Sequence, residues 1–171
     1  YDNDGNQLSY LRQDWDGSDW VNDYQRFYTY DVDGNRLSTL RQNWENNIWV
    51  NFTLFTSTFD TNGYQLSQLY QNWDGNDWVS SWQFFYTYNS DGNLISVLLQ
   101  DWNSNTWVNL GLDTYTYDTN DNQLNMLSQY WNDSTWVMLH QYTYTYDSDG
   151  NMLSELWQSW DGSDWVNDYQ R

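Results

Sequence analysis

The 171-residue sequence lacks cysteine, proline, lysine and alanine, and it contains only two glutamates and one histidine. Helical proteins rely on Ala, Glu and Lys because these residues have high helix propensity, so their scarcity argues against a helical fold. A chain without Cys or Lys has neither a thiol nor an amine side chain to serve as a covalent nucleophile. The absence of Cys fits both oxidising and reducing compartments.

Positive charge is also scarce, with five arginines against 24 acidic residues and a formal net charge of -19. Nucleic acids and anionic membrane surfaces are bound through Lys and Arg, so neither is an expected partner. No apolar run approaches the roughly 18 residues of a membrane-spanning helix, and we expect no membrane insertion. Dense Asp without Lys fits a secreted bacterial protein in calcium-containing surroundings.

The residues that are abundant belong to strands and turns. The sequence has 14 Trp and 16 Tyr, together with many Thr, Val, Asn, Asp and Gly residues. Aromatic and β-branched residues favour strands, whereas Asn, Asp and Gly favour turns. This amino-acid composition predicts an all-β fold.

A 29-residue period runs through the sequence without insertion or deletion. Leu11 and Gln13 each begin a column that recurs in all six repeats. Two Trp columns are equally strict: Trp15, Trp44, Trp73, Trp102, Trp131 and Trp160, and Trp20, Trp49, Trp78, Trp107, Trp136 and Trp165. A period of this length predicts a solenoid, a propeller or a stacked array. We interpret residues 1–171 as a single array of about six repeats.

The segment WDGSDWVNDYQR occurs identically at residues 15–26 and 160–171, five periods apart. Identical copies favour a recent duplication, so we expect the sequence to be a window of a longer repeat protein. The alternative is a closed barrel or propeller-like ring, in which the N-terminal piece completes the last strand.

One repeat reads as two long antiparallel strands and two turns. Residues 20–31 are predicted to form a strand, followed by a three-residue loop, 32–34, in which Gly34 adopts the left-handed conformation. Residues 35–44 return, and the four-residue loop ENNI at 45–48 reverses the chain again. Six repeats predict an antiparallel meander of about twelve strands, forming a coiled or solenoid-like sheet.

The loop lengths predict a register and therefore the faces of the sheet. The expected pairs are Asp31 with Asn35, Tyr28 with Ser38, Arg26 with Leu40, Trp15 with Trp20 and Gln13 with Asn22. If there is no further bulge, alternation gathers the strictest columns on one face: Trp20, Asn22, Tyr28, Tyr30, Ser38, Leu40, Gln42 and Trp44. Val21, Thr29 and Leu37 are expected on the other face, together with Asp23, Gln25 and Phe27.

The strict face resembles the aromatic and amide ladders of repeat proteins, in which rings stack and amides bond along the array. We interpret it as a core or self-association surface, with ligand contact as the alternative. The residues of both Trp columns are accordingly the candidate binding or self-association residues. Exposure decides between these interpretations, because buried Trp columns indicate structure and an open Trp-lined groove indicates binding.

The turns spelled D-x-D-G-N are similar to calcium loops, in which alternate side-chain oxygens and a Gly surround one ion. The candidate calcium ligands are Asp2, Asp4, Asp31, Asp33, Asp147 and Asp149. No acidic residue follows at the twelfth position of an EF-hand loop. The alternative interpretation is a plain hairpin turn whose Asp and Asn side chains bond their own backbone.

At YTYDSDGN, residues 144–151, the sequence resembles the YD repeats of Rhs-like and other secreted bacterial surface proteins. YTYDVDGNRL from Tyr28 matches this pattern of a Tyr-rich strand, Tyr-Asp, two residues, Gly, then Asn or Arg, and Leu. The period here is longer, because each repeat adds a Trp-x-x-x-x-Trp hairpin. The resemblance implies an extracellular or cell-surface bacterial protein with strands wound into a spiral sheet or shell. It brings no catalytic residues with it.

Little catalytic chemistry is available. His140 is the only histidine, and Glu45 and Glu155 lie in different repeats. We therefore expect a protein that is not an enzyme. Two classes of function remain: a structural or adhesive array whose partners are copies of itself or adjoining repeats, and a carbohydrate-binding module whose Trp, Tyr, Asp and Asn side chains contact a polysaccharide.

Overall fold

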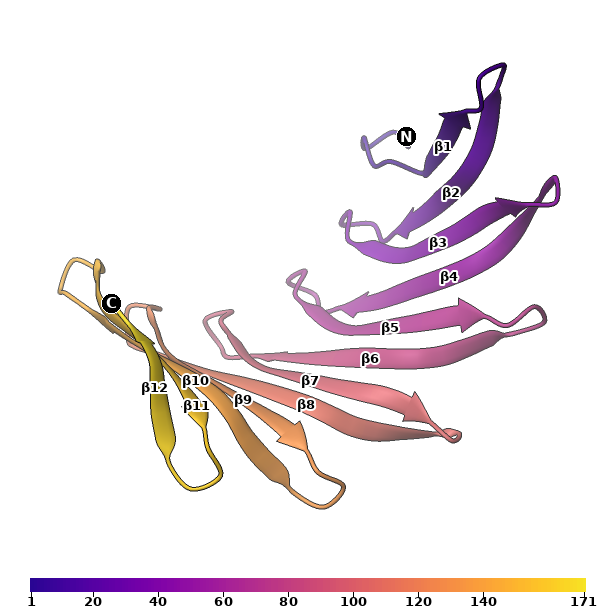
Figure 1. Cartoon of the computed structure of the whole chain (residues 1–171). Helices are drawn as coiled ribbons and strands as arrows, with labels where there is room; N and C mark the ends of the chain where they lie inside the picture. The colour runs from indigo at the N-terminus through magenta and orange to yellow at the C-terminus, as the bar shows by residue number, and fades with distance from the viewer. The chain divides into compact units, whose positions relative to one another are not determined.

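The computed structural model describes residues 1–171 and consists of strands and turns without a helix (Figure 1). The strands are β1 (Ser9–Trp15), β2 (Trp20–Tyr30), β3 (Arg36–Glu45), β4 (Ile48–Phe59), β5 (Gln65–Trp73), β6 (Trp78–Tyr88), β7 (Leu94–Asn103), β8 (Thr106–Tyr117), β9 (Gln123–Trp131), β10 (Trp136–Tyr146), β11 (Met152–Trp160) and β12 (Trp165–Gln170). The predicted all-β fold with two long strands in each repeat is confirmed.

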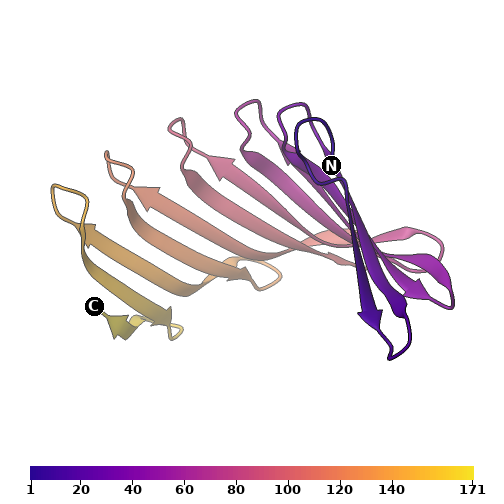
Figure 2. The same cartoon turned by 90° about the horizontal axis from the view of Figure 1, so that it is seen from above.

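The twelve strands follow one another in sequence order, β1 to β12, and each pairs with its neighbours in an antiparallel meander. β1 and β12 do not pair with each other, so the sheet does not close into the alternative barrel. Two compact units, Tyr1–Gln83 and Phe84–Arg171, divide the chain within β6. Inside each unit consecutive strands lie side by side, with the turns alternating between the two strand ends (Figure 2).

Each unit is a single layer of sheet. Most domains bury one face of a sheet against a second layer. Here no hydrophobic side chain is buried, and Thr53, 5% exposed, is the one buried residue. The strict columns therefore do not form a buried core. Cross-strand contacts between half-buried side chains hold the sheet together instead.

Two recurrent bulges set which residues share a face. The first lies on the outgoing strand: Arg12 pairs with Tyr24 and Gln13 with Asn22, which leaves Asp23 as an extra residue on β2. The same offset recurs at Phe52, Leu110, Leu139 and Asp168. A bulge of one residue reverses the alternation of every later side chain on that strand.

The second bulge lies on the return strand, where Thr29 pairs with Ser38 and Tyr30 with Arg36, leaving Leu37 as the extra residue. It recurs at Leu66, Leu124 and Leu153. The second bulge restores the alternation that the first one reversed. The return-strand columns therefore remain on the face of the Trp residues, as predicted.

The predicted register is correct at the Trp hairpin and at the other end of the strand, where the Asp31 N–H donates to the Asn35 carbonyl at 3.0 Å, but it is wrong between these ends. Trp15 pairs with Trp20 and Gln13 with Asn22, as expected. Tyr28, however, pairs with Thr39 rather than Ser38, and Arg26 pairs with Arg41 rather than Leu40. Because of the first bulge, Tyr28 and Tyr30 lie on the face opposite Trp20, whereas Gln25, Phe27 and Thr29 lie on the Trp20 face.

The turns that follow Tyr-Asp differ in length from the turns that join the two Trp residues of a hairpin. The loop Val32–Asp33–Gly34 has three residues as predicted, with Gly34 at φ 85° and its N–H donating to the Asp31 carbonyl at 3.3 Å. The predicted four-residue ENNI loop is wrong, because Glu45 pairs with Ile48. Asn46 and Asn47 have φ 51° and 65°, the signature of a two-residue type I′ turn.

The Tyr of the Tyr-Asp pair joins successive repeats. The Tyr30 hydroxyl donates to the Gln7 carbonyl at 3.0 Å, 23 residues earlier. Tyr117 donates to the Leu94 carbonyl at 2.9 Å, and Tyr146 donates in the same way. The following Asp caps the turn. The Tyr-Asp spelling therefore combines a bond between repeats with the turn that reverses the chain.

Candidate functional site

The face that carries both Trp columns, here named the Trp face, repeats its Leu11, Gln13, Trp15 and Trp20 columns without change. The indoles of each Trp hairpin meet edge to face, with ring centroids 4.9 to 5.6 Å apart and interplanar angles of 63° to 67°. Edge-to-face packing is favourable because the positive ring edge meets the negative ring face. The predicted pairing of the two Trp columns is confirmed, within each hairpin.

Amide side chains form a second ladder on the Trp face. The Gln25 amide donates to Gln42 at 2.7 Å, and Gln42 donates to Asn51 at 2.8 Å. In the C-terminal unit, Gln141, Gln158 and Asn167 repeat this relay at 2.6 and 2.7 Å. Hydroxyl pairs such as Thr58 and Ser67, 2.7 Å apart, add a third row.

The Trp face is nevertheless open to solvent. Trp15 and Trp20 are 55% and 64% exposed, and the other Trp residues of the two columns are half-buried. Apolar residues elsewhere on both faces also remain exposed. Extended exposed apolar surface marks interaction sites in soluble proteins.

The opposite face, here named the Tyr face, carries Tyr24, Arg26, Tyr28 and Tyr30 of β2. Its central columns change from repeat to repeat. The column that begins at Arg26 continues as Phe55, Phe84, Asp113 and Tyr142. The column that begins at Arg12 continues as Arg41, Tyr70, Leu99, Ser128 and Trp157. The chain therefore combines one constant face with one variable face.

The candidate calcium ligands lie in the turns, where the first Asp of each loop is already hydrogen-bonded. Asp31 Oδ1 accepts from the Asp33 N–H at 3.0 Å and the Asn35 N–H at 2.8 Å, and Oδ2 accepts from the Asn35 amide at 2.9 Å. The Asn35 side chain and these backbone bonds lower the pKa of Asp31. Asp2 and Asp147 have the same arrangement and the same direction of pKa shift.

Asp33 and its equivalents Asp4 and Asp149 are exposed at the loop tips and do not join a larger acidic cluster. In residues 1–171, no group of three or more His, Cys, Asp and Glu side chains is placed to hold a metal ion. Calcium binding at these turns stays a prediction.

The only histidine is placed in the sheet rather than in a catalytic constellation. His140 Nδ1 lies 3.1 Å from the Ser159 hydroxyl, and its ring centroid is 5.9 Å from that of Trp157. Glu45 lies beside a turn, and Glu155 pairs with Tyr144 inside the sheet.

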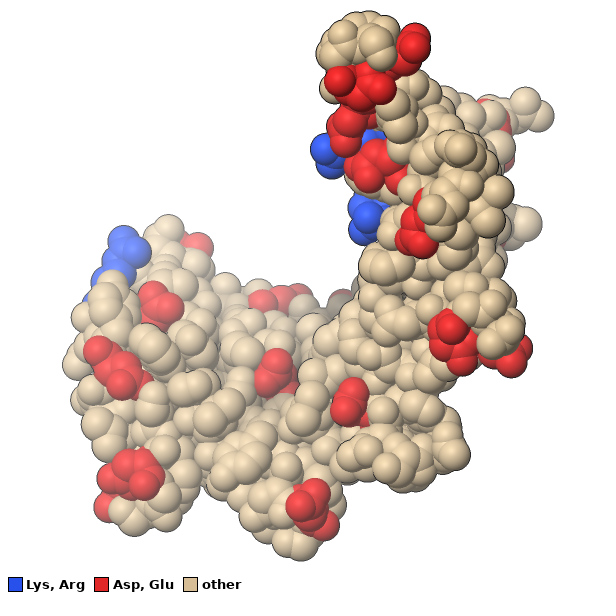
Figure 3. Space-filling view, turned by 45° about the vertical axis from the view of Figure 1, so that its right-hand side comes forward, with Lys and Arg blue, Asp and Glu red and all other residues tan.

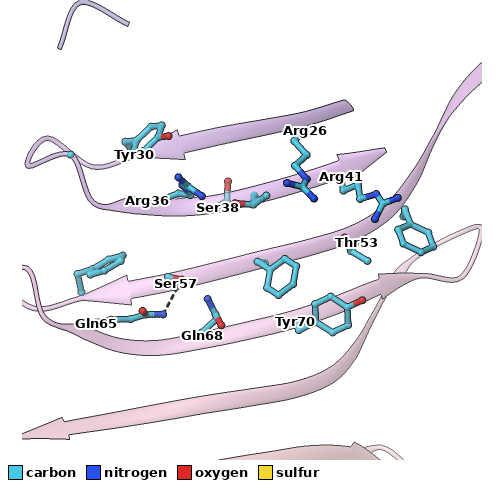
Figure 4. Close-up of a pocket in the computed structure, with 15 residues that line it drawn as sticks. Arg26, Tyr30, Arg36, Ser38, Arg41, Thr53, Ser57, Gln65, Gln68 and Tyr70 are labelled. Carbon is cyan, nitrogen blue, oxygen red and sulfur yellow. Dashed lines mark hydrogen bonds between the residues drawn. The ribbon is translucent and has the colours of Figure 1, made fainter. Parts of the chain in front are cut away.

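A hollow of about 680 Å³ opens on the Tyr face of the N-terminal unit, over β2 to β5 (Figure 4). Arg26, Arg36 and Arg41 line it together with the rings of Phe55 and Tyr70. Sequence reasoning did not single out these arginines. Their distribution along the sequence could have indicated the site, because four of the five Arg residues lie between residues 12 and 41. Figure 3 shows that arginine residues occupy a few places on the visible surface, whereas acidic residues recur along it.

No protein-family model and no curated protein matches the sequence. Among solved structures, a protein of unknown function from Bacteroides fragilis is similar, with a TM-score of 0.52 and 13% identity over 68% of this chain and 90% of that one. A DUF3836 family protein from Bacteroides vulgatus is 22% identical over 51% of this chain and 90% of that one, with a TM-score of 0.41.

The structure of TcdB2-TccC3-TEV matches 95% of this chain with a TM-score of 0.51 and 14% identity. This chain spans 11% of that one. At these identities the similarity concerns the fold alone. None of the elements is a helix long and apolar enough to cross a membrane.

Proposed function

We propose that the chain is a non-catalytic structural repeat array of an extracellular bacterial surface protein, and that it builds a fibre or shell by stacking repeats. The observation that carries this proposal is the drift-free repetition of a single-layer sheet that has no core and whose first and last strands, β1 and β12, each pair with one neighbour only. Such a sheet is completed by further strands at its edges or by a covering surface.

Two likenesses support the proposal. The Tyr-Asp turns resemble the YD repeats of secreted surface proteins, and the fold matches TcdB2-TccC3-TEV over 95% of this chain. The similar structure from Bacteroides fragilis supports a bacterial source. An adhesive role would use the same exposed aromatic surface.

The outer edges of β1 and β12 provide the route for assembly, because each of these strands has one neighbour only. The period never drifts, so β12 of one copy can pair with β1 of the next as β2 pairs with β3. Gln25 lies opposite Gln42 in that pairing, which places Gln170 opposite Gln13 of the next copy. Head-to-tail contacts of this kind form open filaments unless the rotation closes.

The chain has no cysteine, so engineered disulfides report this contact cleanly. The double variant Gln13→Cys, Gln170→Cys is expected to form a disulfide-linked ladder of oligomers under mild oxidation, because directly opposed strand residues lie within disulfide reach. The control Gln13→Cys, Tyr169→Cys moves one thiol to the other face and is expected to stay unlinked.

Electron microscopy should show elongated particles that lengthen with salt, because screening relieves repulsion between chains of net charge -19. Compact monomers at every salt concentration, without the Gln13–Gln170 linkage, would contradict the proposal.

A carbohydrate-binding function is the second candidate, and the exposure of the aromatic residues favours it. Trp15 and Trp20 are more than half exposed, as stacking against sugar rings requires. Binding of neutral glucan oligosaccharides that is lost on Trp→Ala substitution in one hairpin would support it. If binding persists after the substitution, the Trp face is not the carbohydrate-binding surface.

A further inference from the structure

Arg26 on β2 and Arg41 on β3 lie directly opposite each other on the Tyr face. Like charges in opposed positions destabilise an antiparallel pair. Neither arginine forms a salt bridge, although the chain contains 24 acidic residues. Arg12, on the same face, lies 3.2 Å from both Asp14 and Asp23, which neutralise it. Arg26 and Arg41 are therefore an opposed pair of cations without a counter-charge in the chain.

Aromatic rings hold these two guanidinium groups in place. The Arg41 guanidinium carbon lies 4.6 Å from the centroid of Tyr24 and 4.9 Å from that of Phe52, and the Arg26 carbon lies 5.1 Å from Tyr24. A guanidinium group that packs against a ring keeps its N–H groups free to bind an anion in the plane of the group. The Arg41 Nε–H donates to the side-chain oxygen of Asn43 at 3.1 Å. The terminal N–H groups of Arg41 are left to bind an anion.

The pair opens into the hollow described above. Arg36 lies on the same hollow, 4.8 Å from the Tyr28 ring, and buried Thr53 also lines it. Figure 4 shows Arg26 and Arg41 toward one end and the amides of Gln65 and Gln68 toward the other. A hollow of about 680 Å³ falls within the range of small-molecule sites.

Other repeats show that the fold does not require these charges. The equivalent pair in the next repeat is Phe55 and Tyr70, whose ring centroids are 4.6 Å apart. In the C-terminal unit it is Tyr142 and Trp157, stacked with an interplanar angle of 2°. The same register therefore accepts a neutral aromatic pair, and the arginines need another explanation.

We propose that this hollow binds an anionic polysaccharide, with Arg26 and Arg41 together holding a carboxylate on one sugar. Arginine pairs with carboxylates through two parallel N–H bonds, and two opposed arginines suit a charged group placed between them. Phe55 and Tyr70 offer rings on which a sugar face stacks, and Gln68 offers an amide for hydroxyl groups. This combination favours an acidic glycan over an acidic peptide, which would not use the rings.

The inference goes beyond the proposed function and does not depend on it, because all of the residues belong to the N-terminal unit of one chain. Glycan binding and assembly are also distinguished by their dependence on salt concentration. Glycan binding through Arg26 and Arg41 weakens as salt rises, whereas edge-to-edge assembly strengthens.

Calorimetric titration with tetragalacturonate at about 50 mM salt tests the site. The wild-type chain is expected to bind it, and any binding of the neutral cellotetraose is expected to be unchanged by substitution of Arg26 or Arg41. Arg26→Gln and Arg41→Gln are each expected to weaken binding at least about tenfold, because each removes one side of the carboxylate clamp. The matched control is Arg12→Gln, whose charge is already neutralised, and it should retain the affinity within about twofold.

Thermal melting of the same variants excludes a merely structural role. Removing one of two opposed like charges should leave the melting temperature of Arg26→Gln and Arg41→Gln unchanged or higher. The proposal is overturned if tetragalacturonate does not bind, if poly-aspartate binds equally well, or if Arg12→Gln loses as much affinity. It is also overturned if Arg26→Gln and Arg41→Gln weaken cellotetraose binding as much as tetragalacturonate binding. A lower melting temperature of both variants, with binding lost in proportion, would overturn it as well.

Discussion

The indoles of Trp44 and Trp49 meet edge to face across the β3–β4 hairpin, with ring centroids 4.9 Å apart. The two-residue turn Asn46–Asn47 lies immediately beyond them, because Glu45 pairs with Ile48. Cross-strand aromatic contact and turn geometry therefore support each other at one end of the hairpin. In a sheet without a buried core, such local pairs carry much of the stability.

We predict that Trp44 and Trp49 stabilise the sheet as a coupled pair. A double-mutant cycle with Trp44→Ala and Trp49→Ala, measured by urea unfolding, should give a coupling free energy of about 0.5–1.5 kcal/mol. The matched control is Trp15 and Trp20, whose greater exposure and 5.6 Å separation should give a smaller coupling energy. Additive effects at Trp44 and Trp49 would show that the ring contact contributes nothing.

A second prediction concerns the type I′ turn between β7 and β8. Ser104 and Asn105 have φ 50° and 65°, a conformation that Asn and Gly adopt more readily than Ser. Ser104→Asn or Asn105→Gly should therefore raise the free energy of unfolding by about 0.5–1 kcal/mol. Ser18→Asn, in a longer turn without positive φ at that position, is the control. A lower denaturation midpoint for Asn105→Gly would rule out the turn assignment.

The turn carboxylates predict acid sensitivity. The Asn35 side chain and turn N–H groups lower the pKa of Asp31 from its ordinary value of 3.8. A carboxylate whose pKa is lower in the folded state stabilises the fold above the unfolded pKa, and this contribution disappears as the pH falls through the folded pKa. Asp31→Asn should therefore reduce the loss of stability below about pH 4.

Asn89 supplies a natural comparison, because it occupies the same turn position and accepts the same N–H groups without titrating. Stability is measured by urea unfolding between about pH 6 and pH 2.5. If wild type and Asp31→Asn lose stability in parallel over this range, the turn carboxylate does not account for the acid sensitivity.

Calcium binding at the D-x-D-G-N turns gives a fourth prediction. Added CaCl₂ should raise the melting temperature more than NaCl of equal ionic strength, and calorimetry should detect weak binding, since bound ligand stabilises the folded state. The double variant Asp31→Asn, Asp33→Asn should reduce the heat. Because Asp31 already accepts three hydrogen bonds within its turn, we expect the affinity to be low. Equal effects of the two salts on the melting temperature, without binding heat, would show that these turns do not bind calcium.

The sequence by itself determined the repeat, the strands and most of the turns. A drift-free period of 29 residues, with Trp at two fixed positions, predicts the meander and the pairing of Trp15 with Trp20. Gly34 marks the left-handed residue of its loop because glycine adopts positive φ without steric cost. These features are local, and local residue chemistry specifies them.

Only the tertiary structure decided the faces of the sheet. The first bulge falls on residues as different as Asp23, Phe52 and Leu110, so residue type does not mark it. A single extra residue moves every later side chain to the other face. That shift separates Tyr28 from Trp20, and the second bulge, at Leu37, places Arg26 opposite Arg41. Side chains far apart in sequence become a site through pairing between strands, because the register depends on hydrogen bonds that no single strand contains.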